Sequence, residues 1–419
     1  MRVNYNFARF KPSNILNPLR LPIRCILNFE NCTFVTLKLK TTGLKIAVNT
    51  RLLLPGKLEG IGWFTYETLK RITRAHPEHE FLFLFDRKYS EEFIFGDNVT
   101  PIVVPVQARH PILFHLWFEW MIPPVLRKHD VDLFLSPDGY LSLNSEKKQL
   151  AVIHDINFEY YPRHLPFAVR KYYRYYFPKF AEKATRIATV SQFSKEDIIR
   201  HYETEPDKID VVYNGVSDVY KPNSVENKNA TREKFTQGHD YFIFIGSIQP
   251  RKNLALLFKA FDLFKKENNT DIKLLIVGEK KWWTKAIKRS FEGMEFQKDV
   301  IFSGRLPQEK LSQALASSLA LVYVSFFEGF GIPIVEAMNC EVPVITSNIT
   351  SMPEVAGAAA VYVSPFDIHS IKEGMEKIAF DPALVTKLVE AGKIQREKFS
   401  WDQTAEKLWD SIEKCLNES

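Results

Sequence analysis

The feature that most constrains the fold is the alternation of short, wholly apolar runs with longer amphipathic stretches. After a polar stretch over residues 221–235 the same alternation resumes. The runs are LKIAVN, FLFLF, IVVPV, DLFLSP, LAVIHD, RIATVS and DVVYNGV, then YFIFIGSI, IKLLIVG, VIFSG, LALVYVS, VPVITS and AVYVSP. Strands that are apolar on both faces are typical of parallel sheets covered by helices. The pattern therefore predicts an α/β protein with two consecutive Rossmann-like domains.

The length of the chain supports two domains. A chain of 419 residues is longer than one hydrophobic core usually serves. We expect a first domain over residues 44–220, a polar linker, a second domain over 233–397, and an amphipathic helix over 400–419. Residues 1–43 begin with a basic stretch that has no apolar segment of a secretory signal, and we expect a poorly ordered leader there.

Composition excludes several classes of protein. The chain is 45% hydrophobic and 25% charged, as in soluble globular proteins, and no apolar run is long enough to span a bilayer. Cys25, Cys32, Cys340 and Cys415 lack the spacing of a zinc site or a disulfide framework, which favours a reducing compartment. The net charge of +6 suits acidic small molecules or an anionic membrane surface, and is too small to indicate nucleic acid.

Two basic residues stand where a strand gives way to a helix. The stretch GSIQPRKNL places Arg251 and Lys252 after Gly246, at the start of a helix predicted over residues 253–268. A helix N-terminus presents free N–H groups and a partial positive charge, so two added cations favour phosphate binding. The alternative is a pair of solvated cations, which this end of a helix disfavours slightly.

Glutamates accompany a glycine turn in EGFGIPIVEAM. Main-chain N–H groups are accessible at this helix start, where Pro333 suits the first turn. Glu328 can accept hydrogen bonds from hydroxyl groups while those amides donate to others, which is a sugar-binding arrangement. Glu336 follows within the helix, where an acid facing the core would be costly unless a polyol bound it.

A second glycine pair, Gly60 and Gly62, precedes an amphipathic helix in LEGIGWF. It would let the backbone approach a ligand. Such a pair is more often a simple turn, and no Walker A or complete GxGxxG pattern is present.

Together with HDINFEYYP, TVSQFSKEDI, VVYNGV and FSGRLP, these motifs resemble the retaining glycosyltransferases of family 4, also called group 1, from about Leu44 to the C-terminus. The resemblance implies the GT-B fold, with two parallel sheets facing across a cleft and a last helix that crosses back to the first domain. It also implies transfer of a hexose such as mannose from a nucleoside-diphosphate sugar to an acceptor hydroxyl.

The resemblance implies a role for each motif, with Glu328 and His154 as the catalytic candidates. His154 could equally be a core residue. A metal site is not expected there, because no second ligand lies at a useful spacing. The implied binding residues are Arg251, Lys252, Gly60 and Gly62 for the diphosphate, Glu336 for the ribose, Gly278, Arg305 and Leu306 for the base, and Glu328, Gly329, Phe330, Gly331 and His154 for the sugar.

We expect no metal and no cofactor. Asp130 and Asp132 form a DVD sequence, but they precede a strand, at the end of the sheet away from ligands. Fixed cations and a helix dipole can balance the charge of a leaving diphosphate instead. Retention, implied by the resemblance, would follow from front-face attack in which the departing phosphate takes the acceptor proton; alternatively Glu328 would stabilise positive charge on the sugar.

The expected partners are a nucleotide sugar and a saccharide or lipid-linked saccharide acceptor, with no nucleic acid, in bacterial polysaccharide or glycolipid synthesis in the cytoplasm. Two aromatic and basic stretches, over residues 110–130 and 163–180, suit peripheral contact with the inner face of the membrane. Alternatively their aromatic residues pack on the first sheet. The competing functions are a silent nucleotide-sugar-binding protein or another GT-B enzyme, such as a sugar-nucleotide epimerase or a phosphorylase.

Overall fold

The computed structural model describes residues 43–280 and 282–418. The expected leader therefore lies outside the described residues, except for Gly43.

The first domain is built on a seven-stranded sheet in the order β3-β2-β1-β4-β5-β6-β7. Every neighbouring pair of strands is parallel. The strands are β1 (Lys45–Asn49), β2 (Glu80–Phe85), β3 (Val99–Val103), β4 (Leu133–Ser136), β5 (Lys148–Val152), β6 (Arg186–Thr189) and β7 (Ile209–Val211).

The second domain repeats this pattern with a six-stranded parallel sheet in the order β10-β9-β8-β11-β12-β13. Its strands are β8 (Tyr241–Ile245), β9 (Lys273–Val277), β10 (Val300–Gly304), β11 (Ala320–Tyr323), β12 (Val344–Ser347) and β13 (Ala360–Val363). In both sheets the strand order reverses beside the first strand, and ligands of such sheets bind at this switch point. The predicted pair of Rossmann-like domains is confirmed.

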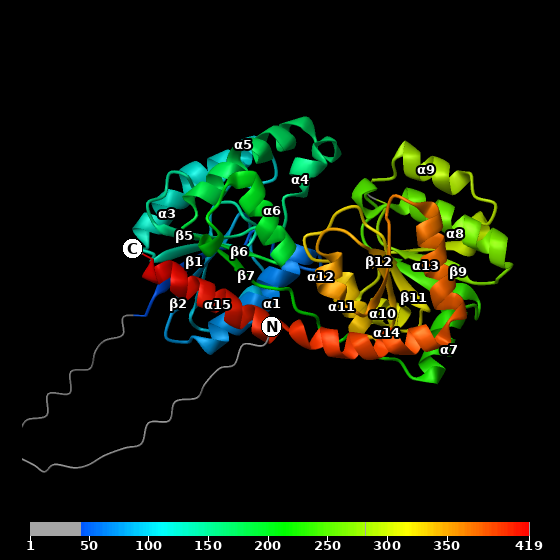
Figure 1. Ribbon diagram of the computed structural model, residues 1–419. Coiled ribbons are helices and arrows are strands. Elements are labelled where there is room, and N and C mark those ends of the chain that lie inside the picture. Colours follow the sequence, from blue (N-terminus) through cyan, green and yellow to red (C-terminus); the bar gives the residue numbers. More distant parts are fainter. Residues whose placement is uncertain (1–42, 281, 419) are drawn as a thin grey trace, which may run out of the picture. The chain divides into compact units, whose positions relative to one another are not determined.

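Helices connect the strands and cover the sheets (Figure 1). In the first domain they are α1 (Gly60–Ala75), α2 (Pro111–His115), α3 (Ile122–Lys128), α4 (Asn157–Tyr160), α5 (Phe167–Lys183) and α6 (Gln192–Tyr202). They continue with α7 (Val225–Thr236), α8 (Leu254–Asn268), α9 (Lys285–Glu292), α10 (Gln308–Ala316), α11 (Ile332–Asn339), α12 (Met352–Ala356), α13 (Ile368–Phe380), α14 (Pro382–Gln395) and α15 (Trp401–Asn417). Short turns of helix are η1 (Glu91–Phe93), η2 (Leu116–Met121, a π-helix), η3 (Pro162–His164), η4 (Pro206–Lys208), η5 (Pro250–Lys252), η6 (Gln297–Asp299) and η7 (Arg396–Lys398).

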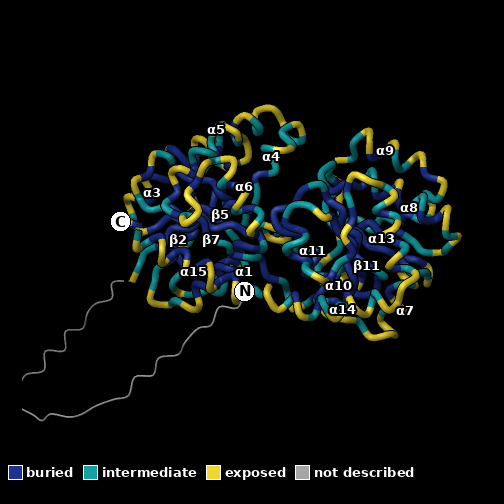
Figure 2. Tube along the Cα trace, in the orientation of Figure 1, coloured by how far each residue is buried: buried dark blue, intermediate teal, exposed yellow. Residues whose placement is uncertain are grey.

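The central strands are buried along most of their length, as their continuous apolar sequences predict (Figure 2). The edge strands β3, β7 and β10 are buried only at their first residue. In β8, Phe242 and Phe244 pack in one cluster with the apolar side chains of α8 and α13, such as Phe258. The alternate residues of the same strand, such as Ile243, pack in another cluster with those of α10 and α11. Successive side chains of a strand point to opposite faces, so each sheet needs a layer of helices on both sides.

Two segments differ from the sequence-based expectation. The edge strand β3 begins at Val99 and ends at Val103, so it starts before the expected run IVVPV and does not reach Pro105. It contains Pro101, which an edge strand tolerates. The stretch expected to be a linker contains helix α7, whose start is capped by the Ser224 hydroxyl accepting from the Asn227 N–H. Few of its residues are buried, and its sequence is mostly polar. The sequence therefore gives no periodic apolar pattern from which the helix could be predicted.

The last helix, α15, packs against α1, β5 and β6 of the first domain. The Thr404 hydroxyl donates to the Tyr213 carbonyl at 2.7 Å, and Lys148 Nζ donates to the Leu416 carbonyl at 2.6 Å. Gly215 makes this docking possible, because a Cβ there would lie 2.2 Å from the Trp401 nitrogen.

We expect Gly215→Ala to lower the free energy of unfolding by about 1–3 kcal/mol, because the added methyl group overlaps the backbone at the start of α15. Chemical denaturation measures the change. Gly60→Ala is the matched control, since no heavy atom lies within 4 Å of a Cβ at that position. If both variants were as stable as the wild type, the close contact between Gly215 and α15 would be wrong.

Candidate active site

The strand order brings the basic pair and the first glutamate together. Strands β8 and β11 are neighbours, with Ile243 opposite Leu321. Arg251 and Lys252 lie on η5, which follows β8, and Glu328 lies in the loop after β11. A backbone hydrogen bond of 2.9 Å, from the Phe326 N–H to the Arg251 carbonyl, joins these two segments. The site therefore forms at the carboxyl ends of the strands, at the switch point of the second sheet.

Glu328 is held between the two cations. Its Oε2 lies 2.7 Å from Arg251 Nη1, and its Oε1 lies 2.7 Å from Lys252 Nζ. Lys252 also donates to the Tyr323 hydroxyl at 2.6 Å, and Arg251 Nη1 to the Phe327 carbonyl at 2.7 Å. Glu328 and Lys252 are 6% and 9% exposed, so this is a buried, charge-assisted network.

The environment of Glu328 determines its protonation state. Burial alone would raise the pKa of its carboxyl, but Arg251 and Lys252 outweigh burial and lower the pKa to about 2. The carboxylate is therefore ionised at neutral pH, and it is a poor proton donor and a weak base. The Glu328 carboxylate can therefore accept hydrogen bonds and stabilise nearby positive charge.

The two cations respond differently to burial. Burial lowers the pKa of Lys252 to about 8, although Glu328 acts in the opposite direction. Burial also disfavours the charge on Arg251, but Glu328 outweighs it and raises the pKa. The two cations outnumber Glu328, and Asp155 also lies near enough to raise the pKa of both Arg251 and Lys252.

Asn253 fixes the turn that carries the cations. It has the left-handed φ of 61° and forms the N-cap of α8. Its amide nitrogen donates to the Val324 carbonyl at 3.0 Å and to the Pro365 carbonyl at 2.7 Å. Asparagine is among the few residues that tolerate this conformation, and its side chain ties η5 to the loops after β11 and β13.

His154 follows β5 and lies against the glycine turn after β11. A Cβ on Gly329 would lie 2.3 Å from the His154 carbonyl oxygen and 2.7 Å from the Asp155 Cβ, so only glycine fits there. His154 Nε2 donates to the Pro137 carbonyl at 2.8 Å. Burial lowers the pKa of His154, so its neutral ring keeps an acceptor at Nδ1. The structure thus brings His154 and the Glu328 loop together.

The motif TVSQFSK supplies contacts that the sequence alone did not assign. The Ser191 hydroxyl donates to the Gly329 carbonyl at 2.6 Å, and the Ser194 hydroxyl lies 3.2 Å from the same oxygen. Glu354 accepts from the N–H groups of Gln192 at 2.7 Å and Phe193 at 3.0 Å, at the start of α6. A hydroxyl residue before a helix predicts an N-cap. The hydrogen bond from Ser191 to Gly329, which is far away in the chain, cannot be predicted from the local sequence.

Glu336 has a partner within the protein. It lies on α11, and the Tyr220 hydroxyl forms a hydrogen bond with its carboxylate. Burial raises the pKa of Glu336 to about 7, with Tyr220 acting in the opposite direction. The expectation that only a polyol would satisfy this carboxylate overlooked Tyr220. Burial, with the charges of Glu328 and Glu336, also raises the pKa of Tyr323, which places Tyr323 near both acids.

The remaining predicted site residues lie near the ends of β1, β9 and β10. No heavy atom lies within 4 Å of a Cβ on Gly60, whereas one on Gly62 would lie 3.2 Å from the Leu52 carbonyl oxygen. A side chain on Gly62 would therefore need its neighbours to shift by a few tenths of an ångström. Arg305 Nη2 donates to the Leu58 carbonyl at 3.2 Å, which ties the end of β10 to the loop before Gly60.

The end of β9 approaches the end of β8 closely. Gly278 has a φ of +154°, and a Cβ there would lie 1.9 Å from the Gly246 carbonyl oxygen. Phe330 is buried and contacts Tyr213 and Phe399. Leu306 is partly buried against the apolar core, and Gly331 is the N-cap of α11 with a φ of 101°.

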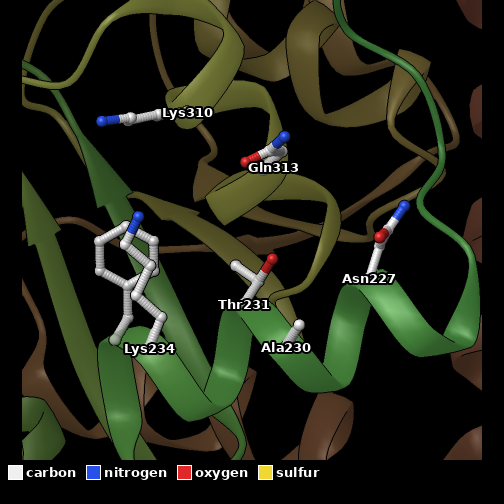
Figure 3. A pocket seen from close by; sticks show the side chains of 7 residues that line it. Asn227, Ala230, Thr231, Lys234, Lys310 and Gln313 are labelled. Carbon is white, nitrogen blue, oxygen red and sulfur yellow. The ribbon is translucent and has the colours of Figure 1, made fainter.

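Two other features lie apart from this cluster. Asp132 accepts from the Lys45 N–H at 2.8 Å, and Asp130 lies 2.8 Å from Lys147; both precede β4, at the opposite end of the strands. A pocket of about 180 Å³ lies between α7 and α10 (Figure 3). Its lining residues are Asn227, Ala230, Thr231, Lys234, Phe235, Lys310 and Gln313, none of which the sequence singles out.

Comparison with known families gives two matches. Residues 58–219 match the model described as Glycosyltransferase Family 4, and residues 226–395 match the model described as Glycosyl transferases group 1. The chain is 28% identical to O-antigen chain mannosyltransferase B of Escherichia coli, covering 82% of this chain and 93% of that protein. It is 27% identical to O-antigen chain mannosyltransferase RfbU of Salmonella typhimurium, covering 69% and 77%.

Solved structures share the fold. Anabaena HepE in complex with UDP and glucose matches with a TM-score of 0.70 and 17% identity, covering 88% of this chain and 100% of that one. WaaG, a glycosyltransferase involved in lipopolysaccharide biosynthesis, matches with a TM-score of 0.67 and 18% identity, covering 88% and 99%. The two-sheet architecture is therefore that of known GT-B glycosyltransferases.

We expect Glu328→Gln to lower the free energy of unfolding by about 3 kcal/mol at neutral pH, because the folded-state pKa of about 2 lies well below the ordinary 4.5. The folded protein holds this proton less tightly than the unfolded chain does. The difference between wild type and variant is therefore complete above pH 4.5 and shrinks as the pH falls towards 2.

Urea unfolding at a series of pH values measures this difference. Glu390→Gln is the control, since it removes an ion pair with Lys393 whose glutamate is 63% exposed, and such pairs contribute little. Equal losses for the two variants would show that the Glu328 cluster does not behave as a buried ion pair.

Proposed function

This chain belongs to the family 4, or group 1, glycosyltransferases, and from that premise we propose that it transfers mannose from a nucleoside-diphosphate sugar to a hydroxyl of a growing polysaccharide. The observation that carries the proposal is the Arg251–Glu328–Lys252 cluster. The names of the O-antigen mannosyltransferases at 27–28% identity support mannose and polysaccharide synthesis. The transferase activity itself accords with both family matches.

The cluster suits a diphosphate. Among the described residues, the Arg251 side chain donates hydrogen bonds only through Nη1, which leaves Nε and Nη2 for a ligand. Lys252 Nζ has three donors and two partners, Tyr323 and Glu328. Diphosphate oxygens bound there would receive charge-assisted hydrogen bonds and the dipole of the α8 N-terminus. These fixed cations would balance the charge of the leaving group, so the proposal needs no metal.

Glu328 and His154 would face the transferred sugar. An ionised carboxylate accepts hydroxyl hydrogens, and it stabilises positive charge that develops on the sugar ring as the bond to phosphate breaks. A carboxylate with a pKa of about 2 is a weak base for the acceptor hydroxyl. The leaving phosphate would therefore take that proton on the same face of the sugar, and the configuration at the anomeric carbon would be retained.

Transfer from a panel of GDP, UDP and ADP sugars to fluorescent oligosaccharides tests this function. We expect GDP-mannose to give an elongated product in the presence of a chelator, with an α-anomeric NMR signal from the α-linked donor.

We expect Lys252→Met to weaken nucleotide binding about tenfold or more, because a charge-assisted hydrogen bond contributes about 1.5–3 kcal/mol. The thermal shift with nucleoside diphosphate measures it.

The variant Glu328→Gln separates binding of the nucleotide from sugar transfer. It should keep most of the thermal shift that nucleoside diphosphate induces, while turnover is lost. Lys310→Met, in the pocket between α7 and α10, is the matched control for removal of a lysine. An inverted product would contradict front-face attack, and the absence of any transfer would contradict the proposed function.

We further propose that the first domain contacts a membrane surface that carries lipid-linked acceptors. Ile112, Leu116 and Trp120 are 71%, 37% and 66% exposed, and their spacing of four places them on one side of the α2–η2 helix. Other aromatic residues of the two stretches pack in the core as the alternative expects, namely Phe114, Trp117, Phe118, Tyr172, Phe177 and Phe180.

The exposed aromatic residues lie among cations. Helix α5 packs beside α2, with the Tyr176 hydroxyl 3.0 Å from His115 Nδ1. Its exposed Phe167 and Tyr175 lie under lysine ammonium groups, with Lys179 Nζ 3.8 Å from the Tyr175 ring centre. The only acid between residues 109 and 128 is the buried Glu119. An apolar stripe among cations favours an anionic lipid surface. None of the helices in residues 43–280 and 282–418 is long and apolar enough to cross a bilayer.

The double substitution Ile112→Asp with Trp120→Asp should abolish sedimentation with vesicles that contain phosphatidylglycerol, because it places charge on the apolar stripe. Phe380→Asp is the control, since Phe380 is 56% exposed on the second domain. Wild-type protein that stayed in the supernatant with these vesicles, or bound pure phosphatidylcholine equally well, would contradict contact with an anionic membrane.

A further inference from the structure

A group of aromatic side chains borders the ion cluster and has no role in the donor contacts described above. Tyr160, Tyr161 and His164 lie on the segment formed by α4 and η3, which follows His154. Phe327 immediately precedes Glu328, and its carbonyl accepts from Arg251 Nη1 at 2.7 Å. The aromatic group and the charged group are therefore joined through one residue.

Phe327 is the fixed centre of this group. It is 3% exposed, and its ring centre lies 5.0 Å from that of Tyr160 and 5.5 Å from that of Phe193. The Tyr160 hydroxyl donates to the buried carboxylate of Asp197. Tyr160 is thus held at both ends, by Asp197 and by Phe327, and serves as a support.

Tyr161 and His164 form a stacked pair beside this support. Their rings are stacked, with centres 5.2 Å apart and planes within 9° of parallel. The Tyr161 ring meets Phe327 edge-on at 6.4 Å. Both side chains are partly exposed. Burial, together with the nearby charge of Arg251, lowers the pKa of His164, so the ring is neutral at pH 7 and the pair presents an uncharged surface close to the cations.

The position of the pair relative to the second sheet distinguishes between ligands. The base of the nucleotide is expected near Gly278, Arg305 and Leu306, at the ends of β9 and β10. The sheet order β10-β9-β8-β11-β12 puts these strands on one side of β8, whereas Phe327 follows β11 on the other. The aromatic pair therefore lies away from the expected base.

We propose that Tyr161 and His164 form the platform on which the acceptor sugar stacks while its hydroxyl meets the donor. This inference rests on the proposed glycosyltransferase function. A pyranose has a face of C–H groups and a rim of hydroxyls, and a flat neutral aromatic surface binds that face while leaving the rim free. Glu328 directly follows Phe327, and His154 precedes α4 on the segment that leads to the pair, so both proposed catalytic residues come from the loops that carry this aromatic group.

The test compares the wild type with Tyr161→Ala and Tyr161→Phe on a soluble acceptor. The acceptor is whichever of the fluorescently labelled mannosyl, N-acetylglucosaminyl and rhamnosyl disaccharides the wild type elongates fastest. We expect Tyr161→Ala to raise the KM for this acceptor about tenfold, as loss of one aromatic contact would. Tyr161→Phe keeps the ring and should keep the KM. The KM for the donor and the rate of donor hydrolysis without acceptor should stay unchanged in both variants.

Phe380→Ala is the matched control, because it removes an aromatic ring that is 56% exposed on α13. An unchanged acceptor KM in Tyr161→Ala would overturn the platform while leaving the transferase function intact. A raised KM for the donor alone would assign the pair to the nucleotide base and would also overturn it. Wild-type protein that elongates none of the sugars and hydrolyses no donor would contradict the proposed function itself.

Discussion

The carboxylate of Glu328 between Arg251 and Lys252 is the interaction on which the rest of the site depends. Two cations placed side by side in a nearly buried turn repel one another and lose hydration, and this cost is offset only when an acid lies within hydrogen-bonding distance of both. The 2.7 Å contacts provide that compensation. They also set the charge state of the acid, because they keep the carboxylate ionised at neutral pH.

Close backbone approach is the second constraint. Gly329 lies against the backbone of His154, where no side chain would fit. The Ser191 hydroxyl donates a hydrogen bond to the Gly329 carbonyl. Glu354 caps the start of α6. The contacts of Gly329 orient the loop that carries Glu328, so the acid is positioned by main-chain geometry as well as by its ion pairs.

The division of labour within the site follows from these constraints. The charged residues come from turns after β8 and β11, where parallel strands end at the switch point of the second sheet. The aromatic pair Tyr161 and His164 comes from the segment after β5 in the first sheet. The two groups fall within the segments that match the two glycosyltransferase family models, residues 226–395 for the charged group and 58–219 for the aromatic pair.

The sequence by itself determined the architecture and the members of the charged cluster. Continuous apolar runs require parallel sheets with helices on both faces, and cations or glycines after such runs lie at the ligand-binding end. Both are local properties of the chain. The sequence did not predict helix α7, because its polar residues give no periodic apolar face.

Only the tertiary structure decided the partnerships. Glu328 pairs with both cations, Tyr220 bonds to Glu336, Ser191 bonds to Gly329, and the Tyr161 ring meets Phe327 edge-on. All four contacts depend on strand order and on close packing. The partners are far apart in the chain, and a hydrogen bond or ring contact requires a separation set to within a fraction of an ångström, which no local pattern of residues specifies.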